Sequence, residues 1–247
     1  MNTPRIALVT GAAQGIGKSI ASRLCEEGYK VVLADINAQL VNSVTAELLA
    51  HGYKVFGIVC DVSSVDSIKN TIKATVDTFG GLDVLVNNAG ILRTSDIPNL
   101  DEAEWDQVLA VNLKSVFFMV QQALPYLKKS LAPRIINMSS LAGRMGGFNT
   151  SLSYSASKGG VLALTMGLAR QLAPFNITVN AVCPSTTESD MILQWDEETR
   201  ALQSSRAPLG RLGKPDEIAS AVNYLASTEA AFVTGLLMDV NGGTYMG

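Results

Sequence analysis

A phenol and an ammonium group four residues apart, Tyr154 and Lys158, form the pair in this sequence best suited to proton transfer. In a helix this spacing places both side chains on one face. A tyrosine with a pKa of about 10 is a poor base at neutral pH, and a nearby cation favours its phenolate. We therefore predict a general acid or base for an alcohol or ketone oxygen, although the same spacing also arises by chance in many helices.

A glycine cluster at residues 11–17 follows a strand-like run and precedes a helical pattern. Glycines let the backbone approach a pyrophosphate, whose charge then lies at the helix N-terminus. The predicted cofactor-binding residues of this loop are Gly11, Gln14, Gly15, Ile16 and Gly17. Asp35 ends the next apolar run, where a carboxylate accepts hydrogen bonds from ribose hydroxyls. A turn without a ligand, a methyltransferase loop, and a helix-capping role for Asp35 remain open.

Seven short apolar runs alternate with helical patterns along the chain. The runs cover residues 6–10, 31–34, 55–59, 82–86, 134–138, 177–182 and 236–240. Two helical patterns, Ile16–Glu27 and Ser64–Phe79, end at a glycine, which is a usual stop signal. Strands that are apolar throughout are typical of a parallel sheet buried on both faces. We predict an α/β, doubly wound Rossmann-type fold with a seven-stranded parallel sheet, and residues 1–247 as one domain.

Composition excludes several classes of protein. Hydrophobic residues make up 47% of the chain and charged residues 17%, against about 25% charged in typical domains, which predicts a large core and apolar surface between subunits. The net charge of −3 argues against nucleic-acid binding. The single histidine, His51, precedes a glycine and reads as an exposed helix end rather than a catalytic or metal-binding residue.

Three cysteines, Cys25, Cys60 and Cys183, are far apart and fit buried, reduced thiols. The chain has no uncharged apolar stretch of membrane-spanning length. A strand-like run begins at Arg5 and leaves no room for a signal peptide. We therefore expect a soluble, cytoplasmic protein without a membrane span.

Further residues fall in an order typical of one family. Besides the glycine cluster and the Tyr154–Lys158 pair, they are Asp61-Val62, Asn87-Asn88-Ala89-Gly90, Asn112, Ser139-Ser140, Arg211-Leu212-Gly213-Lys214-Pro215 and Asn241-Gly242-Gly243. Together these motifs make essentially the whole chain resemble a classical short-chain dehydrogenase/reductase.

The resemblance implies roles for individual residues. Tyr154 would exchange a proton with the substrate oxygen, and Lys158 would lower the pKa of Tyr154 and hold the nicotinamide ribose. Ser140 would hydrogen-bond the substrate oxygen as charge develops. Asn112 would anchor a water that links Lys158 to solvent. Neighbouring strand residues face opposite ways, so only one of Ser139 and Ser140 enters the site, and the family's pattern favours Ser140.

The resemblance also implies a nicotinamide cofactor and no metal, and Asp35 indicates NAD rather than NADP. Asp61 and Val62 would bracket the adenine, and the middle of the cofactor would lie along Asn87, Asn88, Ala89 and Gly90. After Pro184 the family usually has glycine, but this chain has Ser185. Ser189 takes the place of the family's threonine, which holds the carboxamide. Pro184 and Ser189 are the predicted cofactor-binding residues of this loop. Because serine restricts the backbone more than glycine does, we expect Ser185 to change how the loop closes.

The leading interpretation is an NAD-dependent oxidoreductase that interconverts a secondary alcohol and a ketone of small-molecule size. The alternative is a 3-oxoacyl-[acyl-carrier-protein] reductase, which the C-terminal third resembles closely. Asp35 argues against the alternative, because those reductases generally use NADPH. Residues 174–176 also offer no basic group to an acidic carrier protein, although Lys128 and Lys129 keep the possibility open. A non-catalytic NAD sensor is a third reading, disfavoured by the intact catalytic set.

Two segments depart from the plain strand–helix pattern. Gly159 to Ala169 carries no charge, and with the apolar helix near residues 111–124 it is expected to bury surface between subunits. The family resemblance points to a homotetramer, in which Gly160 and Gly167 would let backbones approach closely. Ser185 to Ala207 is polar and long, and we expect it to form a lid over the substrate.

Overall fold

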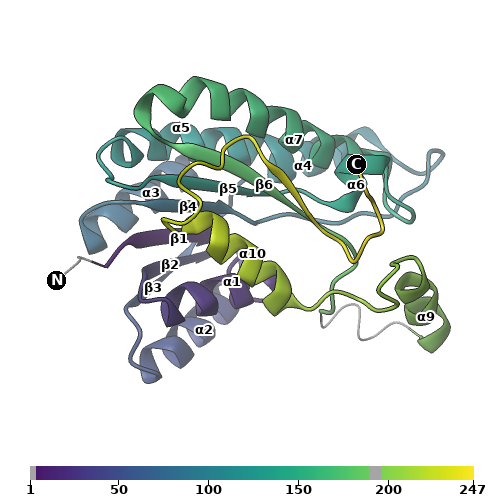
Figure 1. The fold of residues 1–247 in the computed structure, drawn as a ribbon, viewed down its shortest axis with the longest axis horizontal. Coiled ribbons are helices and arrows are strands. Elements are labelled where there is room, and N and C mark those ends of the chain that lie inside the picture. Colours follow the sequence, from purple (N-terminus) through teal and green to yellow (C-terminus); the bar gives the residue numbers. More distant parts are fainter. Residues whose placement is uncertain (1–3, 190–195) are drawn as a thin grey trace.

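The computed structural model describes residues 4–189 and 196–247. Its centre is a parallel seven-stranded sheet with the strand order β3-β2-β1-β4-β5-β6-β7 (Figure 1). The strands are β1 (Ile6–Thr10), β2 (Lys30–Asp35), β3 (Val55–Val59), β4 (Val84–Asn87), β5 (Arg134–Met138), β6 (Thr178–Pro184) and β7 (Leu237–Val240). Each predicted run overlaps one of these strands, so the predicted doubly wound sheet is confirmed.

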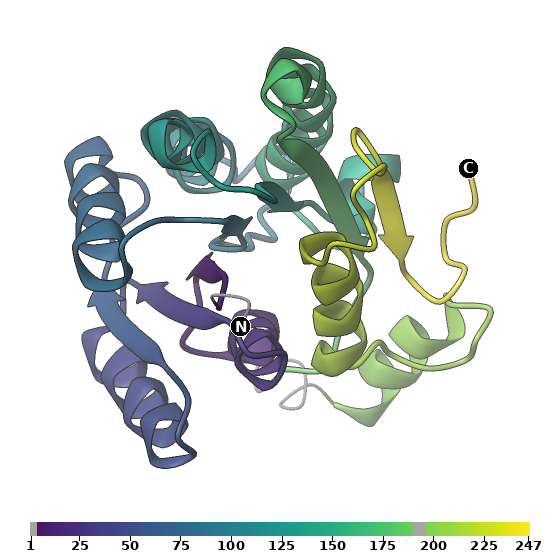
Figure 2. The same cartoon turned by 60° about the vertical axis from the view of Figure 1, so that its left-hand side comes forward.

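Helices cover both faces of the sheet. They are α1 (Gly15–Glu26), α2 (Ala38–Ala50), α3 (Val65–Phe79), α4 (Glu102–Leu109), α5 (Ser115–Leu127), α6 (Leu141–Met145), α7 (Leu152–Leu172), α9 (Glu197–Ser205) and α10 (Pro215–Ala226). A π-helical segment, η1 (Ala110–Lys114), joins α4 to α5, and a 3-10 turn, η2 (Ala173–Phe175), follows α7. Helices α1, α2 and α10 form one layer, and α3, α5 and α7 form the other (Figures 1 and 2).

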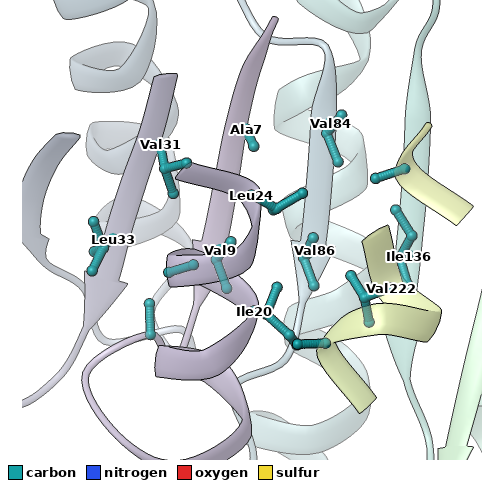
Figure 3. Close-up of a cluster of buried hydrophobic side chains, with 14 of the residues drawn as sticks. Ala7, Val9, Ile20, Leu24, Val31, Leu33, Val84, Val86, Ile136 and Val222 are labelled. Atoms are coloured by element: carbon teal, nitrogen blue, oxygen red, sulfur yellow. The ribbon is translucent and has the colours of Figure 1, made fainter. Parts of the chain in front are cut away.

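The central strand β1 shows how the sequence builds both layers. Ala7 and Val9 belong to the apolar cluster under α1 and α10, whereas Leu8 belongs to the cluster on the opposite face. Figure 3 shows Ile20 and Leu24 of α1 over this part of the sheet, and both side chains are fully buried. Side chains alternate between the faces of a strand, and both faces of this sheet are covered, so the strands are apolar at every position.

The strand order reverses beside β1, which pairs with β2 on one side and β4 on the other. In open α/β sheets, ligands bind at such a switch point, beyond the carboxyl ends of the strands. The glycine cluster follows β1 and the Asn88-Ala89-Gly90 segment follows β4. The fold therefore brings these two predicted motifs to one edge of the sheet.

Residues Glu102–Leu127 form one long helix from α4, η1 and α5. The sequence predicted an apolar helix only near residues 111–124. This helix has 26 residues, and an 18-residue window within it has a mean hydropathy of 1.2, so by length and composition it could cross a membrane. One such helix is weak evidence, because core helices of globular proteins pass the same test. Here Asn112, Met119 and Leu127 are buried within the chain.

The uncharged stretch Gly159–Ala169 lies in α7, and five of its eleven residues are buried within its own chain. Its buried side chains are Val161, Leu162, Thr165, Leu168 and Ala169. A Cβ atom at Gly160 would lie 2.7 Å from the Leu113 side chain of the same chain, so glycine at position 160 leaves room for that side chain. A subunit contact at Gly160 stays a prediction. Gly167 has no neighbouring atom within 4 Å of that position, and Met166 is 38% exposed. A subunit contact at Gly167 stays a prediction.

The residues expected to take no part in chemistry lie as predicted. His51 is the exposed C-cap of α2, with Nδ1 2.8 Å from the carbonyl oxygen of Glu47. Cys25, Cys60 and Cys183 are free and buried.

Candidate active site

A cavity of about 1240 Å³ opens at the carboxyl ends of the strands. The predicted site residues that line it are Gly11, Gln14, Gly15, Ile16, Gly17, Asp35, Asp61, Val62, Asn88, Ala89, Gly90, Ser140, Tyr154 and Ser189. A second cavity of about 190 Å³ is lined by Lys158 and Pro184, and it shares Ser140 and Tyr154 with the first. Asn112 lines neither cavity and lies buried behind them.

The glycine-rich loop has the shape of a cradle for a diphosphate. A Cβ atom at Gly17 would lie only 1.9 Å from the carbonyl oxygen of Gly11, so no side chain fits there. Gly15 has a φ of +51° and open space where a side chain would be. Gln14, the N-cap of α1, makes no capping hydrogen bond with its side chain. The positive end of α1 is therefore available to an anion, and the loop fits a dinucleotide.

Asn88 and Thr10 brace this loop. The side-chain amide of Asn88 donates hydrogen bonds to the carbonyl oxygens of Thr10 (2.9 Å) and Gly11 (3.0 Å). The hydroxyl of Thr10 accepts hydrogen bonds from the backbone amides of Asn88 and Ala89, both at 3.0 Å. The sequence analysis gave Thr10 no role, although its position directly before the glycine cluster could have indicated one.

Asp35 is held at the end of β2 by two backbone amides. Its Oδ2 accepts a hydrogen bond from Ala13 in the glycine-rich loop, and its Oδ1 accepts one from Asn37, both at 3.0 Å. Asn37 is the N-cap of α2, and its side chain accepts from Leu40. The helix cap that the sequence left open for Asp35 therefore belongs to Asn37.

At the expected adenine end, Asp61 and Val62 both line the larger cavity. The carboxylate of Asp61 accepts hydrogen bonds from the amide (2.9 Å) and the hydroxyl (2.7 Å) of Ser63. Asn87 differs from the expectation that it lines the cofactor. It is buried, and its side-chain amide donates to Asn137 Oδ1 at 2.9 Å, because alternation along β4 turns it away from the cavity.

Ser139 and Ser140 differ in what they reach. Both line the second cavity, but only Ser140 lines the larger one. Ser140 is the N-cap of α6, with its Oγ accepting a hydrogen bond from the Ala142 amide at 3.1 Å. Ser139 is buried and donates to the carbonyl oxygen of Lys158 at 2.9 Å.

Tyr154 and Lys158 lie on one face of α7. The Lys158 ammonium lies 5.8 Å from the centre of the Tyr154 ring and donates to the carbonyl oxygen of Met138 at 2.8 Å. Burial lowers the pKa of Lys158 to about 8. Burial raises the pKa of Tyr154, and a hydrogen bond with the Ser140 hydroxyl opposes that rise. The lowering effect of Lys158 on the pKa of Tyr154, which the sequence predicts, stays a prediction.

Asn112 occupies the widened π turn of η1, where functional residues often lie. Its Oδ1 accepts from the Ile91 amide at 2.8 Å, and its Nδ2 donates to the Ile91 carbonyl at 3.0 Å and to Ser157 Oγ at 3.2 Å. A Cβ atom at Gly90 would lie 3.3 Å from Asn112 Oδ1 and 3.4 Å from the Lys158 ammonium. Glycine at position 90 therefore lets both polar groups approach the backbone.

The Pro184–Ser185 junction departs from the family's pattern without backbone strain. Asn176 is the one non-glycine residue with a positive φ in the described part of the chain, so Ser185 needs no left-handed conformation. The carbonyl oxygen of Ser185 accepts a hydrogen bond from Thr187 Oγ1 at 3.0 Å.

Comparison with known proteins agrees with this geometry. The family described as enoyl-(acyl carrier protein) reductase matches residues 11–245. The chain is 42% identical over 247 residues, all of both chains, to the Staphylococcus aureus (strain Mu50 / ATCC 700699) protein named 3-oxoacyl-[acyl-carrier-protein] reductase FabG. A solved Brucella melitensis structure, named short-chain dehydrogenase/reductase SDR:glucose/ribitol dehydrogenase, is 35% identical with a TM-score of 0.91 and covers 98% of this chain and 97% of that one. The chain belongs to the short-chain dehydrogenase/reductase family.

As a member of the short-chain dehydrogenase/reductase family, the chain is an oxidoreductase that acts on CH–OH groups. The larger cavity is also lined by polar residues to which sequence reasoning gave no individual role: Thr94, Ser95, Asp96, Gln107, Thr199 and Gln203. All but Asp96 are neutral hydrogen-bonding side chains, and no Lys or Arg in the described residues lines this cavity. For Thr199 and Gln203 the one signal was their place in the expected lid.

Proposed function

We propose that this protein interconverts a secondary alcohol and a ketone with NAD(H), and that Tyr154 exchanges the proton with the substrate oxygen. One observation carries the proposal: Tyr154 and Ser140 both line each of the two cavities and so lie where the cavities meet. One end of the larger cavity carries the glycine-rich loop, and the other has room for a substrate. A bound nicotinamide supplies or accepts the hydride.

The chain's own residues perform the proton transfer. Because its pKa is raised, Tyr154 is protonated at neutral pH and is ready to donate to a carbonyl oxygen during reduction. Ser140 offers a second hydroxyl to the same oxygen and stabilises the charge that develops on it. In the oxidation direction Tyr154 must first lose its proton, so oxidation is favoured by alkaline pH.

NAD rather than NADP is proposed because of Asp35. Its carboxylate lines the cavity beside the glycine-rich loop, where it is able to accept hydrogen bonds from ribose hydroxyls. Ile36, the next residue, is 66% exposed and offers no positive charge to a 2′-phosphate.

A second candidate, reduction of a 3-oxoacyl thioester, is supported by the names of the relatives. Among the substrates considered from the sequence, this one has the most support from the comparisons. The keto group of such a thioester is a ketone, so the same residues would act. For carrier-protein docking, Lys128 and Lys129 lie exposed just after α5, with the Lys128 ammonium 3.6 Å over the Phe175 ring, and they are the basic groups there that an acidic partner would meet.

The test is a turnover screen with NADH and NADPH in the reduction direction, and with NAD and NADP in oxidation. Acetoacetyl-CoA and a 3-oxoacyl carrier protein represent the thioesters, and a panel of secondary alcohols and polyols represents the broader class. We expect turnover that favours NADH and is abolished in Tyr154→Phe. NADH binding without turnover of any substrate would instead favour the non-catalytic sensor.

A further inference from the structure

The short helix α6 connects the active site to the edge of the sheet. It begins at Ser140 and carries Arg144 in its last turn. Arg144 forms an ion pair of 2.8 Å with Asp239 on the edge strand β7, and the two side chains are only 15% and 19% exposed. Other ion pairs in the described residues are more exposed, such as Arg211–Glu217 at 49% and 40%.

Residues near the C-terminus cover this ion pair. The Arg144 guanidinium lies 4.8 Å from the centre of the Tyr245 ring, and it donates to the carbonyl oxygen of Gly247 at 3.4 Å. Arg144 Nε and Asp239 Oδ1 are buried and have no hydrogen-bond partner among the described residues. The loss of either charge would therefore leave the other buried with little compensation.

On its other side α6 packs directly against α7. A Cβ atom at Gly143 would lie 2.7 Å from the carbonyl group of Lys158 and 2.8 Å from Ser139 Oγ. The backbones of α6 and α7 thus touch beside the predicted catalytic lysine. Helix α6 is held between α7 on one side and the β7 ion pair on the other.

Helix α6 has only five residues, and a helix of that length is not stable alone. The Ser140 hydroxyl accepts from the Ala142 amide in its first turn, so the direction of that hydroxyl depends on where α6 lies. We propose that Arg144 and Asp239 are positioning residues whose ion pair, covered by Tyr245, holds α6 against α7 and keeps Ser140 beside Tyr154 where both line the cavities. This inference rests on the proposed roles of Ser140 and Tyr154.

The first test is kinetic, with Asp239→Asn, which keeps the side-chain shape and removes its charge. We expect kcat to fall about tenfold while KM for NADH stays within about twofold, because the change reaches the proton-transfer group and not the glycine-rich loop. In a Ser140→Ala background the same substitution should have no further effect on kcat. Additive effects in this double-mutant cycle would overturn the proposal.

The second test does not need a substrate. In NMR spectra of protein labelled with ¹³C-tyrosine, the resonance of the Tyr154 ring carbon that bears the hydroxyl is the one missing from the Tyr154→Phe spectrum. Asp239→Asn should shift this resonance in the direction that Ser140→Ala shifts it, and the control Glu217→Gln, in the exposed ion pair, should leave it in place. An unmoved resonance in a folded Asp239→Asn protein would refute the proposal.

If Asp239→Asn does not fold, Tyr245→Ala carries the same test, because it uncovers the ion pair and leaves both charges in place. A smaller shift in the same direction is expected, and no shift would count against the proposal. Failure of every substrate in the wild type would overturn the proposed function alone, since the resonance reports the Ser140–Tyr154 contact without turnover.

Discussion

The backbone amide of Ala13 donates a 3.0 Å hydrogen bond to Asp35 Oδ2 and so ties the glycine-rich loop to the end of β2. The carboxylate has a second amide partner in Asn37, which fixes its orientation. A fixed anion at this position is the physical basis of the proposed cofactor choice.

We predict a preference for NAD over NADP of roughly 30- to 150-fold in kcat/KM, which is about 2–3 kcal/mol. The 2′-phosphate of NADP would place a second anion beside Asp35. Two unit charges about 4 Å apart repel by about 4 kcal/mol at an effective dielectric of about 20, and solvent reduces this further. Equal or higher values with NADP in the wild type would contradict the prediction.

Substitutions at Asp35 distinguish the effect of its negative charge from its hydrogen bond to the glycine-rich loop. Both Asp35→Ala and Asp35→Asn should reduce the preference for NAD over NADP, mainly by improving NADP binding. The asparagine side chain retains an oxygen that accepts the hydrogen bond from the Ala13 amide. Asp66→Asn, at a largely exposed site on α3, should leave the preference unchanged.

Tyr154→Phe should lower kcat at least about a thousandfold while NADH still binds, because the substitution removes only the proton-transfer hydroxyl. Fluorescence titration with NADH measures binding, and single-turnover kinetics measure the chemical step. Tyr126→Phe, on α5, is the matched control and should keep wild-type turnover. Near-normal turnover in Tyr154→Phe would remove Tyr154 from its proposed role.

The strands and the glycine-rich loop could be predicted from the sequence because each has a local cause. Burial on both faces makes a strand such as β1 apolar throughout, and the close approach of Gly17 to Gly11 excludes every side chain. Such local constraints appear directly as residue types. The seven strands and the placement of Asp35 beside the loop followed from them.

Other features depend on contacts between distant segments and leave no local pattern. Thr94, which precedes α4, and Gln107, within α4, both line the larger cavity. The π turn around Asn112 is a shift in backbone hydrogen bonding that no residue type requires. The effect of Ser140 on the Tyr154 pKa depends on burial and on the position of α6, and neither is visible in the Tyr-x-x-x-Lys spacing.

A homotetramer is expected, with surface of α5 and α7 buried between subunits. Phe117 on α5 and Met166 on α7 are 42% and 38% exposed, and covering such apolar side chains favours association. Light scattering at micromolar concentration should give four times the chain mass. Phe117→Glu should lower that mass, whereas Leu49→Glu, on α2 in the opposite layer, should not. A wild-type monomer would refute the expectation.

Ser185 to Ala207 should open more readily than any other internal segment. Residues 190–195 of this expected lid lie outside the described part of the chain. Within α9, Gln203 is buried and contacts Thr186 Oγ1 at 3.4 Å, and both line the larger cavity. Hydrogen exchange should be fastest here without ligand and should slow when NADH and substrate are present. Protection equal to that of the central strands would contradict a lid.

The protein should lose stability as pH rises above about 9, and Cys25 should contribute to that loss. Burial raises the pKa of the Cys25 thiol from 9.0 to about 12. Between these values the unfolded chain gives up the proton and the folded chain keeps it, so the stabilisation is complete below pH 9 and is lost as pH approaches 12.

Denaturant unfolding at pH 8 and pH 10 measures this loss. Between these two pH values, removal of the thiol in Cys25→Ala should reduce the fall in unfolding free energy by about 1.4 kcal/mol, the value of one pH unit for one proton. Leu24→Ala, on the same helix and equally buried, removes apolar volume without removing a titrating group. Leu24→Ala should lower the unfolding free energy by a similar amount at pH 8 and pH 10, so the decrease between the two pH values should equal that of the wild type. If Cys25→Ala and Leu24→Ala lose the same stability between pH 8 and 10, ionisation of the Cys25 thiol does not drive the alkaline loss.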